Sequence, residues 1–241
     1  MGTMNDYWDS VNYFCALCKK ELSDAFVSFI VTGSLSVGDI VPGWSDVDAF
    51  LVAKSGDASI DAKVKGLVDR VTEKYPFYST DRGSMFCVMV ATLDEVLGMK
   101  GEVSFLTQWD LKRHGAVACG ADIKGDIPEP PLDKEWLDNN TDWMIDFLSR
   151  EKDNSPFWKG RNAIGFIIAG ARNAILKRGK YAKAKDEIER AFGQMFPGKV
   201  ELVSRAMECR WRWGEIQEDG KLIEALYDDA SLFLKWVRAM E

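Results

Sequence analysis

Hydrophobic residues follow two different patterns along the chain, and the pattern changes near its middle. In the first half, short apolar runs alternate with stretches in which apolar residues recur every three or four positions. The runs predict strands over 26–31, 47–53, 85–91 and 116–119, and the periodic stretches predict helices over 6–23, 60–71 and 103–111. The continuous run over 85–91 is typical of a strand that is buried on both faces. The first half is therefore expected to be a mixed sheet with helices.

The second half shows helical periodicity alone. Helices are predicted over 136–148, 157–177, 185–196, 200–213 and 222–240, and Gly179 stands where a helix C-terminus favours glycine. The segment 127–131, Ile-Pro-Glu-Pro-Pro, can continue neither a helix nor a central strand. We therefore expect an α+β protein, with a mixed-sheet domain over 1–126 and an all-α helical bundle domain over 127–241.

The candidate chemistry is concentrated between positions 26 and 53. Gly33-Ser34 ends the first predicted strand, and Ser45-Asp46-Val47-Asp48 opens the next. Asp46 and Asp48 are two positions apart, so they share a face of an extended chain, where paired carboxylates suit Mg²⁺. A Gly-Ser turn lets a phosphate approach the backbone closely. The stretch predicts a metal–triphosphate site, and the alternative is a surface hairpin with two solvated aspartates.

A second set of polar residues lies on the helix predicted over 157–177. Arg161, Gly165 and Arg172 fall on one face of it, and Lys185 follows in the next helix. Arginine and lysine are suited to binding phosphate oxygens. From the residues alone, a solvated basic face explains this pattern equally well.

Composition narrows the possible partners. The net charge is −7, and no basic tract indicates a nucleic-acid groove. No apolar run is long enough to span a bilayer. Five cysteines without framework spacing predict reduced thiols and a cytoplasmic protein, with Cys15 and Cys18 as core residues. His114, the only histidine, is interpreted as an ordinary helix end, so catalysis would proceed without a histidine base.

These motifs resemble the nucleotidyltransferase superfamily of DNA polymerase beta. From about residue 24 onward, the chain is similar to the aminoglycoside adenylyltransferases that modify streptomycin and spectinomycin. The similarity rests on Gly33-Ser34, Ser45 to Asp48, residues 113–120, Arg161-Asn162, Arg172, Gly179-Lys180, Lys185-Asp186 and 210–213. It implies that Mg²⁺ and ATP bind between the domains, that Arg172 and Lys185 contact phosphates, and that Trp213 lies near the nucleotide.

The sequence departs from that family where the acceptor would bind. The family has a third carboxylate, the presumed base, in the strand that matches 85–91, whereas here Cys87 stands near that place. The segment between Glu95 and Glu102 is shorter than in the family, and Lys159 replaces an acid that meets the drug. Glu102 is the nearest acidic candidate for a base. We therefore expect no adenylylation of streptomycin or spectinomycin.

Two functions of different classes follow from these patterns. The first is an Mg²⁺-dependent enzyme that transfers AMP from ATP to a hydroxyl of an unknown small molecule. In it, Asp46 and Asp48 would hold the metal, and Gly33, Ser34, Ser45, Arg172, Lys185 and Trp213 would bind the nucleotide. The alternative is a catalytically degenerate nucleotide-binding protein, or an antitoxin-like protein that binds a partner.

Overall fold

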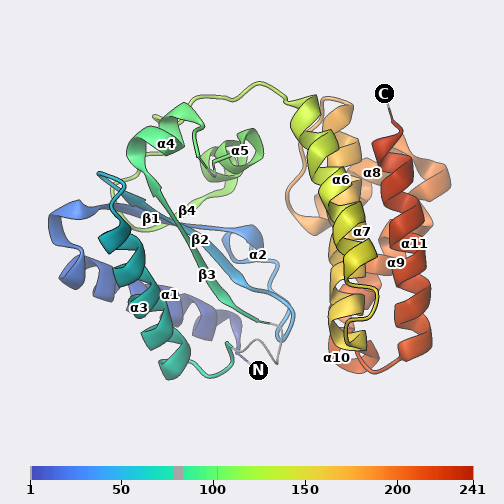
Figure 1. The fold of residues 1–241 in the computed structure, drawn as a ribbon, viewed down its shortest axis with the longest axis horizontal. Coiled ribbons are helices and arrows are strands. Elements are labelled where there is room, and N and C mark those ends of the chain that lie inside the picture. Colours follow the sequence, from blue (N-terminus) through green and yellow to red (C-terminus); the bar gives the residue numbers. More distant parts are fainter. Residues whose placement is uncertain (1, 79–83, 102, 241) are drawn as a thin grey trace. The chain divides into compact units, whose positions relative to one another are not determined.

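A mixed four-stranded sheet organises the first part of the chain. The computed structural model describes residues 2–78, 84–101 and 103–240, and its sheet has the strand order β3-β2-β1-β4. Strand β1 pairs antiparallel with both β2 and β4, whereas β2 and β3 are parallel (Figure 1). The strands are β1 (Phe26–Thr32), β2 (Val47–Ala53), β3 (Phe86–Thr92) and β4 (Ala116–Gly120). All four predicted strands are present, each within one residue of the predicted bounds.

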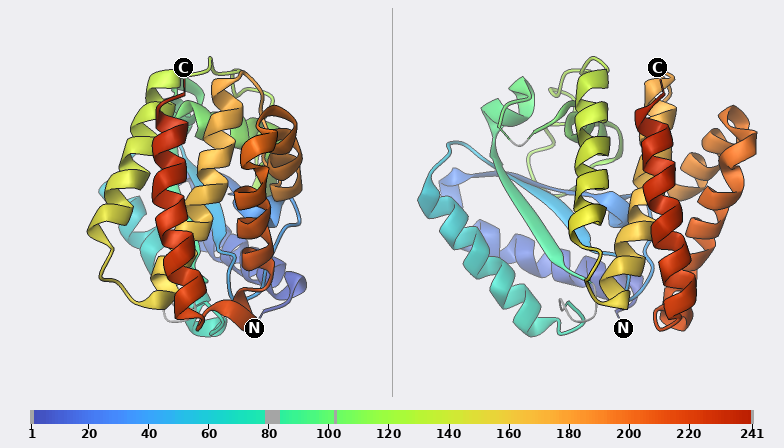
Figure 2. Two further views of the ribbon diagram at one scale, coloured as in Figure 1. Left: turned by 90° about the vertical axis from the view of Figure 1, so that its right-hand side faces the viewer. Right: turned by 45° about the vertical axis from the view of Figure 1, so that its right-hand side comes forward.

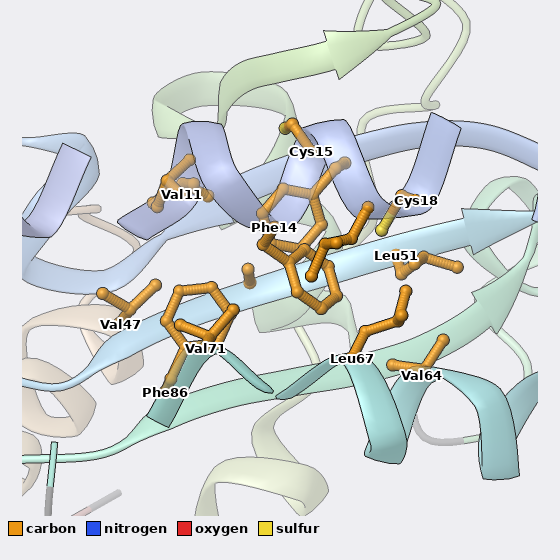
Figure 3. Packing of buried hydrophobic residues seen from close by; sticks show 14 of the residues in the cluster. Val11, Phe14, Cys15, Cys18, Val47, Leu51, Val64, Leu67, Val71 and Phe86 are labelled. Atoms are coloured by element: carbon orange, nitrogen blue, oxygen red, sulfur yellow. The ribbon is translucent and has the colours of Figure 1, made fainter. Parts of the chain in front are cut away.

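Helices cover the two faces of this sheet. The first face is packed by α1 (Met4–Glu21) and α3 (Ala58–Lys74), which enclose the larger core. Figure 3 shows Phe14 of α1, Leu51 of β2 and Leu67 of α3 meeting in this core. The second face is packed by α4 (Leu93–Gly98) and α5 (Phe105–His114) around a smaller apolar cluster. The remaining short elements are a 3₁₀ turn (Ser23–Ala25) and α2 (Gly33–Ser36).

Alternation of side chains along β2 explains which residues reach each core. Val47, Ala49 and Leu51 belong to the α1–α3 side, whereas Phe50 and Val52 belong to the α4–α5 side. Since Asp48 lies between Val47 and Ala49, it shares the α4–α5 face with Phe50. Asp48 is nevertheless exposed, so the helices of this face do not cover it.

The second part of the chain is entirely helical, as its periodicity predicts. Its helices are α6 (Lys134–Arg150), α7 (Pro156–Lys177), α8 (Lys185–Met195), a 3₁₀ turn (Pro197–Lys199), α9 (Val200–Trp211), α10 (Trp213–Ile216) and α11 (Gly220–Arg238). Helix α7 is central and packs against α6, α8, α9 and α11 (Figure 2). Gly179 has φ +75° and ends α7, because its N–H and that of Lys180 bind the carbonyls of Leu176 and Ile175.

The chain separates into two compact units, Met1–Pro131 and Leu132–Glu241, here called the N-terminal unit and the helical unit. The proline-dense segment 127–131 closes the first unit. In the described part of the chain, no helix is both long and apolar enough to cross a membrane.

The burial predicted for the third strand is wrong. Strand β3 is an edge strand, and most of its side chains are only partly buried, with Met89 39% exposed. A continuous apolar run is consistent with burial on both faces, but it does not reveal which strands neighbour it in the sheet.

The prediction of five reduced cysteines is also wrong. Cys15 of α1 forms a disulfide with Cys119 of β4 across 104 residues of sequence. No local spacing indicates this pair, because only the packing of α1 against the sheet brings the two residues together. Cys18 remains a free thiol in the core, as expected for a packing residue, and burial raises its pKa to about 12.

Candidate functional site

Asp48 and Gly33 form the centre of the candidate site. Thr32, the last residue of β1, pairs with Asp48 of β2, and its hydroxyl donates to the Asp48 carbonyl at 3.3 Å. Gly33 follows with φ +65°, a conformation that favours glycine. A Cβ on Gly33 would lie 2.4 Å from Oδ2 of Asp48, so only glycine lets the carboxylate occupy this place. Gly33 of the Gly-Ser turn is therefore in direct contact with the second aspartate of the motif.

Asp46 precedes β2 and is tied to the neighbouring strand. Its Oδ1 accepts a hydrogen bond from the backbone N–H of Met85 at 2.7 Å, just before β3 begins. The backbone N–H of Val47 in turn donates to the Met85 carbonyl at 2.8 Å. These bonds fix Asp46 two residues from Asp48, at the end of the sheet where β1 finishes and β2 and β3 begin.

The loop between Gly33 and Asp46 is held by its own hydrogen bonds. Ser34 lies in α2, and its carbonyl accepts from the N–H of Asp39 at 2.9 Å. Ser45 is buried, and its hydroxyl accepts from the N–H of Val41 at 2.9 Å. The Tyr7 hydroxyl of α1 donates to the Ser45 carbonyl at 3.2 Å. Ser45 therefore shapes the loop, while Ser34 is only partly buried beside Gly33.

Cys87 is the residue of β3 that lies beside Asp48. The parallel register pairs Asp48 with Cys87 and Phe50 with Met89. Directly paired residues share a face of the sheet, so the partly buried Cys87 borders the site at the position where the resemblance to adenylyltransferases implies an acid. Glu102, the acidic candidate from the sequence, lies outside the described residues.

His114, interpreted from the sequence as an ordinary helix end within the segment 113–120, lies toward the end of the sheet that holds the candidate site. It ends α5 immediately before β4, and β4 pairs with β1 so that Ala116 lies opposite Val31. His114 is two residues before Ala116, so the antiparallel register places it at the same end of the sheet as Gly33. His114 can be placed at this end of the sheet only when the antiparallel pairing of β4 with β1 is known. No local pattern in the sequence predicts that pairing.

The helical unit holds Arg172 and Lys185 near a common turn. The Arg172 Nε donates to the Ala182 carbonyl at 3.0 Å, and its guanidinium lies over the Tyr181 ring at 5.3 Å. Lys185 is the first residue of α8, directly after the loop that Arg172 holds. Both side chains are partly buried. The local fold thus places Arg172 against the loop that leads into α8, of which Lys185 is the first residue, and their binding of phosphate stays a prediction.

Trp213 is buried in the helical unit. It is 2% exposed, and its ring packs against Phe157 with the centroids 5.4 Å apart. A Cβ on Gly160 would come within 2.9 Å of the indole, so this glycine makes room for it. The expected role of Trp213 near a nucleotide stays a prediction.

Lys159 forms an ion pair with Glu224. Its ammonium lies 2.7 Å from the Glu224 carboxylate and 5.4 Å from the centroid of the Tyr227 ring. The Lys159 side chain is 13% exposed, whereas that of Glu224 is 56% exposed. Glu224 therefore offsets the charge that the sequence alone assigns to this position.

The residues at the sheet end fit a hard divalent cation. Two carboxylates lie two residues apart, one exposed and the other held by a backbone N–H, and oxygen is the donor that Mg²⁺ prefers. In the described part of the chain, no three acidic, cysteine or histidine side chains form a complete metal-binding group. A cation bound by Asp46 and Asp48 would thus take its remaining ligands from phosphate and water.

One comparison with known proteins gives a match in structure. The spectinomycin adenyltransferase AAD(9) from Enterococcus faecialis, solved with ATP and spectinomycin, has 14% sequence identity and a TM-score of 0.63. The match covers 95% of this chain and 99% of that chain. No protein-family model matches the chain, and no curated protein matches it in sequence. At this identity the comparison shows the fold, and the chain has the α+β fold of that nucleotidyltransferase.

Proposed function

We propose that the protein is an Mg²⁺-dependent nucleotidyltransferase that moves AMP from ATP to a hydroxyl of a small molecule. The observation that carries the proposal is the contact of Gly33 with Asp48, with Asp46 two residues away, at one sheet end of a nucleotidyltransferase fold. The Asp48 carboxylate takes the space that a side chain at position 33 would fill, so a triphosphate bound by the Gly33 backbone would lie beside that carboxylate.

Each residue has a separate task in the proposed reaction. Asp46 and Asp48 hold the cation, which when bound supplies positive charge for the phosphate oxygens. Gly33 and Ser34 bind the triphosphate through the backbone and a hydroxyl, and Ser45 keeps the loop in shape. Arg172 and Lys185 contribute charge-assisted hydrogen bonds to phosphate oxygens. Trp213 is proposed to lie near the nucleotide.

The reaction is an in-line displacement at the α-phosphorus. The acceptor oxygen forms a bond to that phosphorus, the bond to the bridging oxygen breaks, and pyrophosphate leaves with its electron pair. The acceptor proton is lost to water or to a base. Such transfers depend mainly on positioning and electrostatics. The reaction can therefore proceed although Cys87 stands where a carboxylate base is expected.

A second function is favoured by one observation. The β3 position beside Asp48 holds Cys87 instead of an acid, which is consistent with a protein that binds ATP without turning it over. Pyrophosphate release separates the two proposals. Incubation with α-labelled ATP, Mg²⁺ and pools of hydroxyl-bearing compounds should give a labelled product and pyrophosphate in equal amounts. ATP that binds but stays intact with every pool would favour the binding protein.

We also propose that streptomycin and spectinomycin are not acceptors. The pairing of Lys159 with Glu224 weakens the expected repulsion of a cationic drug. The remaining support is the short connection from α4, which ends at Gly98, to α5, which begins at Phe105. Incubation of the protein with labelled ATP, Mg²⁺ and each drug tests this. A labelled drug formed at an ordinary enzymatic rate would contradict it.

A further inference from the structure

Strand β3 forms an edge of the sheet with no partner strand on its outer side among the described residues. It pairs with β2 over seven successive residues without a register shift, from Phe86 to Thr92. Figure 1 shows β3 as a long strand beside β2. The edge is thus regular along its whole length.

Hydrogen bonds at the two ends of β3 show which backbone groups point outward. The Met85 carbonyl accepts from the N–H of Val47, so the odd-numbered residues of β3 direct their polar groups toward β2. Phe86, Val88, Val90 and Thr92 therefore direct theirs toward the open edge. In agreement, the N–H of Thr92 is bound by the Glu95 carboxylate at 2.7 Å instead of by β2.

Strand β3 lacks the features that prevent natural edge strands from pairing with strands of other chains. Natural edge strands carry charges, prolines or bulges that prevent pairing with other chains. The β3 sequence, Phe-Cys-Val-Met-Val-Ala-Thr, has no charge and no proline, and its pairing with β2 has no bulge. Met89, at its centre, is 39% exposed. Such an edge is expected to be covered by another strand.

A groove runs between this edge and helix α3. It has a volume of about 350 Å³, and its walls are mainly apolar. Its apolar lining comes from Val64 and Val68 of α3 and from Phe86, Val88 and Val90 of β3, with Asp61 and Lys65 at its border. The side chains on the α3 face of β3 thus leave space for those of an added strand.

We propose that β3 of a second copy of this chain occupies the edge, antiparallel and related by a two-fold axis at Met89. This register pairs Val88 of each copy with Val90 of the other. Both residues direct their N–H and carbonyl groups outward, so each pair exchanges two hydrogen bonds. The sheet then continues across the dimer, and the valines of each copy reach the groove of the other.

Charges on α3 are complementary in this arrangement. Asp61 lies near the C-terminal end of β3, since it borders a second hollow together with Val90 and Thr92. Lys65 is one helical turn further along α3, at about the level of Val88. Because the two-fold axis sets Val90 of one copy against Val88 of the other, it brings Asp61 of each copy toward Lys65 of the other.

Sedimentation velocity of the full chain tests the proposal. Over about 1 to 100 μM, a range that covers weak interfaces, the protein should sediment increasingly as a dimer. Met89→Lys sets two like charges against each other at the axis and should give a monomer, whereas Met89→Leu should dimerise like the wild type. Circular dichroism checks that each variant is folded.

Charge reversal on the exposed face of α3 gives a second test without changing the strand. Asp61→Lys alone and Lys65→Asp alone should each weaken dimerisation by at least about 3-fold, since each replaces two ion pairs by repulsion. The double variant restores both pairs and should recover the wild-type value. A wild-type monomer at every concentration, a dimer that Met89→Lys leaves intact, or a double variant no better than the single ones would overturn the proposal.

Discussion

Gly33 and Asp48 are in direct contact across the β1–β2 pair, where a Cβ on the glycine would lie 2.4 Å from Oδ2 of the aspartate. The end of one strand therefore determines where the carboxylate of the next is held. Because Asp48 is exposed, this contact positions a group that is accessible to a ligand instead of filling the core.

Gly33→Ala should strongly reduce nucleotide binding. The methyl group would displace the Asp48 carboxylate, and a ligand held in the wrong place binds a cation poorly. We expect at least about a 10-fold loss of ATP·Mg²⁺ affinity, by analogy with changes that misplace metal ligands, measured by calorimetric titration.

Gly38→Ala is the matched control for this change. Gly38 also has a positive φ, +73°, but a Cβ there would meet no described atom within 4 Å. Both variants carry the strain of a left-handed alanine, on the order of 1 kcal/mol, and only Gly33→Ala disturbs Asp48. Equal affinity in the two variants would show that the contact with Asp48 has no role in binding.

Cys87 should be the cysteine that reacts first with iodoacetamide in the native protein. Burial raises the pKa of Cys18 to about 12 and also raises that of Cys209, so both stay neutral and unreactive near pH 8. Cys87 is only partly buried and pairs in register with Asp48. ATP with Mg²⁺ should therefore slow its alkylation, as peptide mass spectrometry can measure. An unchanged rate at saturating nucleotide would place the nucleotide elsewhere.

Arg172→Ala and Lys185→Ala should each weaken ATP binding, because each removes a charge-assisted contact to phosphate. A loss of about 10-fold or more per residue is expected, corresponding to hydrogen bonds to charged groups. Arg178→Ala is a suitable control, since Arg178 is an exposed arginine just after α7. If all three variants bind ATP equally, Arg172 and Lys185 belong to a solvated basic surface.

Local patterns predicted most of the fold, and long-range pairing explains what they missed. Apolar runs located all four strands, and helix-end signals such as Gly179 located the ends of helices, because these depend on neighbouring residues. The edge position of β3 and the Cys15–Cys119 disulfide depend on segments far apart in sequence. Neither feature can therefore be predicted from the local pattern of residues.

The candidate site was predicted to a similar extent. Gly33-Ser34 and Asp46 to Asp48 were recognisable because the motif lies within sixteen residues of sequence. The resemblance placed Cys87 near the position of the expected acid, but its pairing with Asp48 follows only from strand register, as does the placement of His114 at the same end of the sheet as Gly33. The pairing of Lys159 with Glu224 needed the packing of α7 against α11.

Asp46 and Asp48 are proposed to bind a divalent cation together with ATP. Calorimetric titration of ATP in the presence and absence of Mg²⁺ tests it most directly, on the wild type, Asp46→Asn, Asp48→Asn and, as a control, Asp9→Asn on the exposed side of α1. Mg²⁺ should strengthen ATP binding to the wild type and to Asp9→Asn. Each of the other two variants should lose at least about 10-fold of the affinity measured with Mg²⁺ while keeping the wild-type circular dichroism spectrum. ATP·Mg²⁺ affinity that is the same in all four folded proteins would show that these two aspartates do not hold the cation.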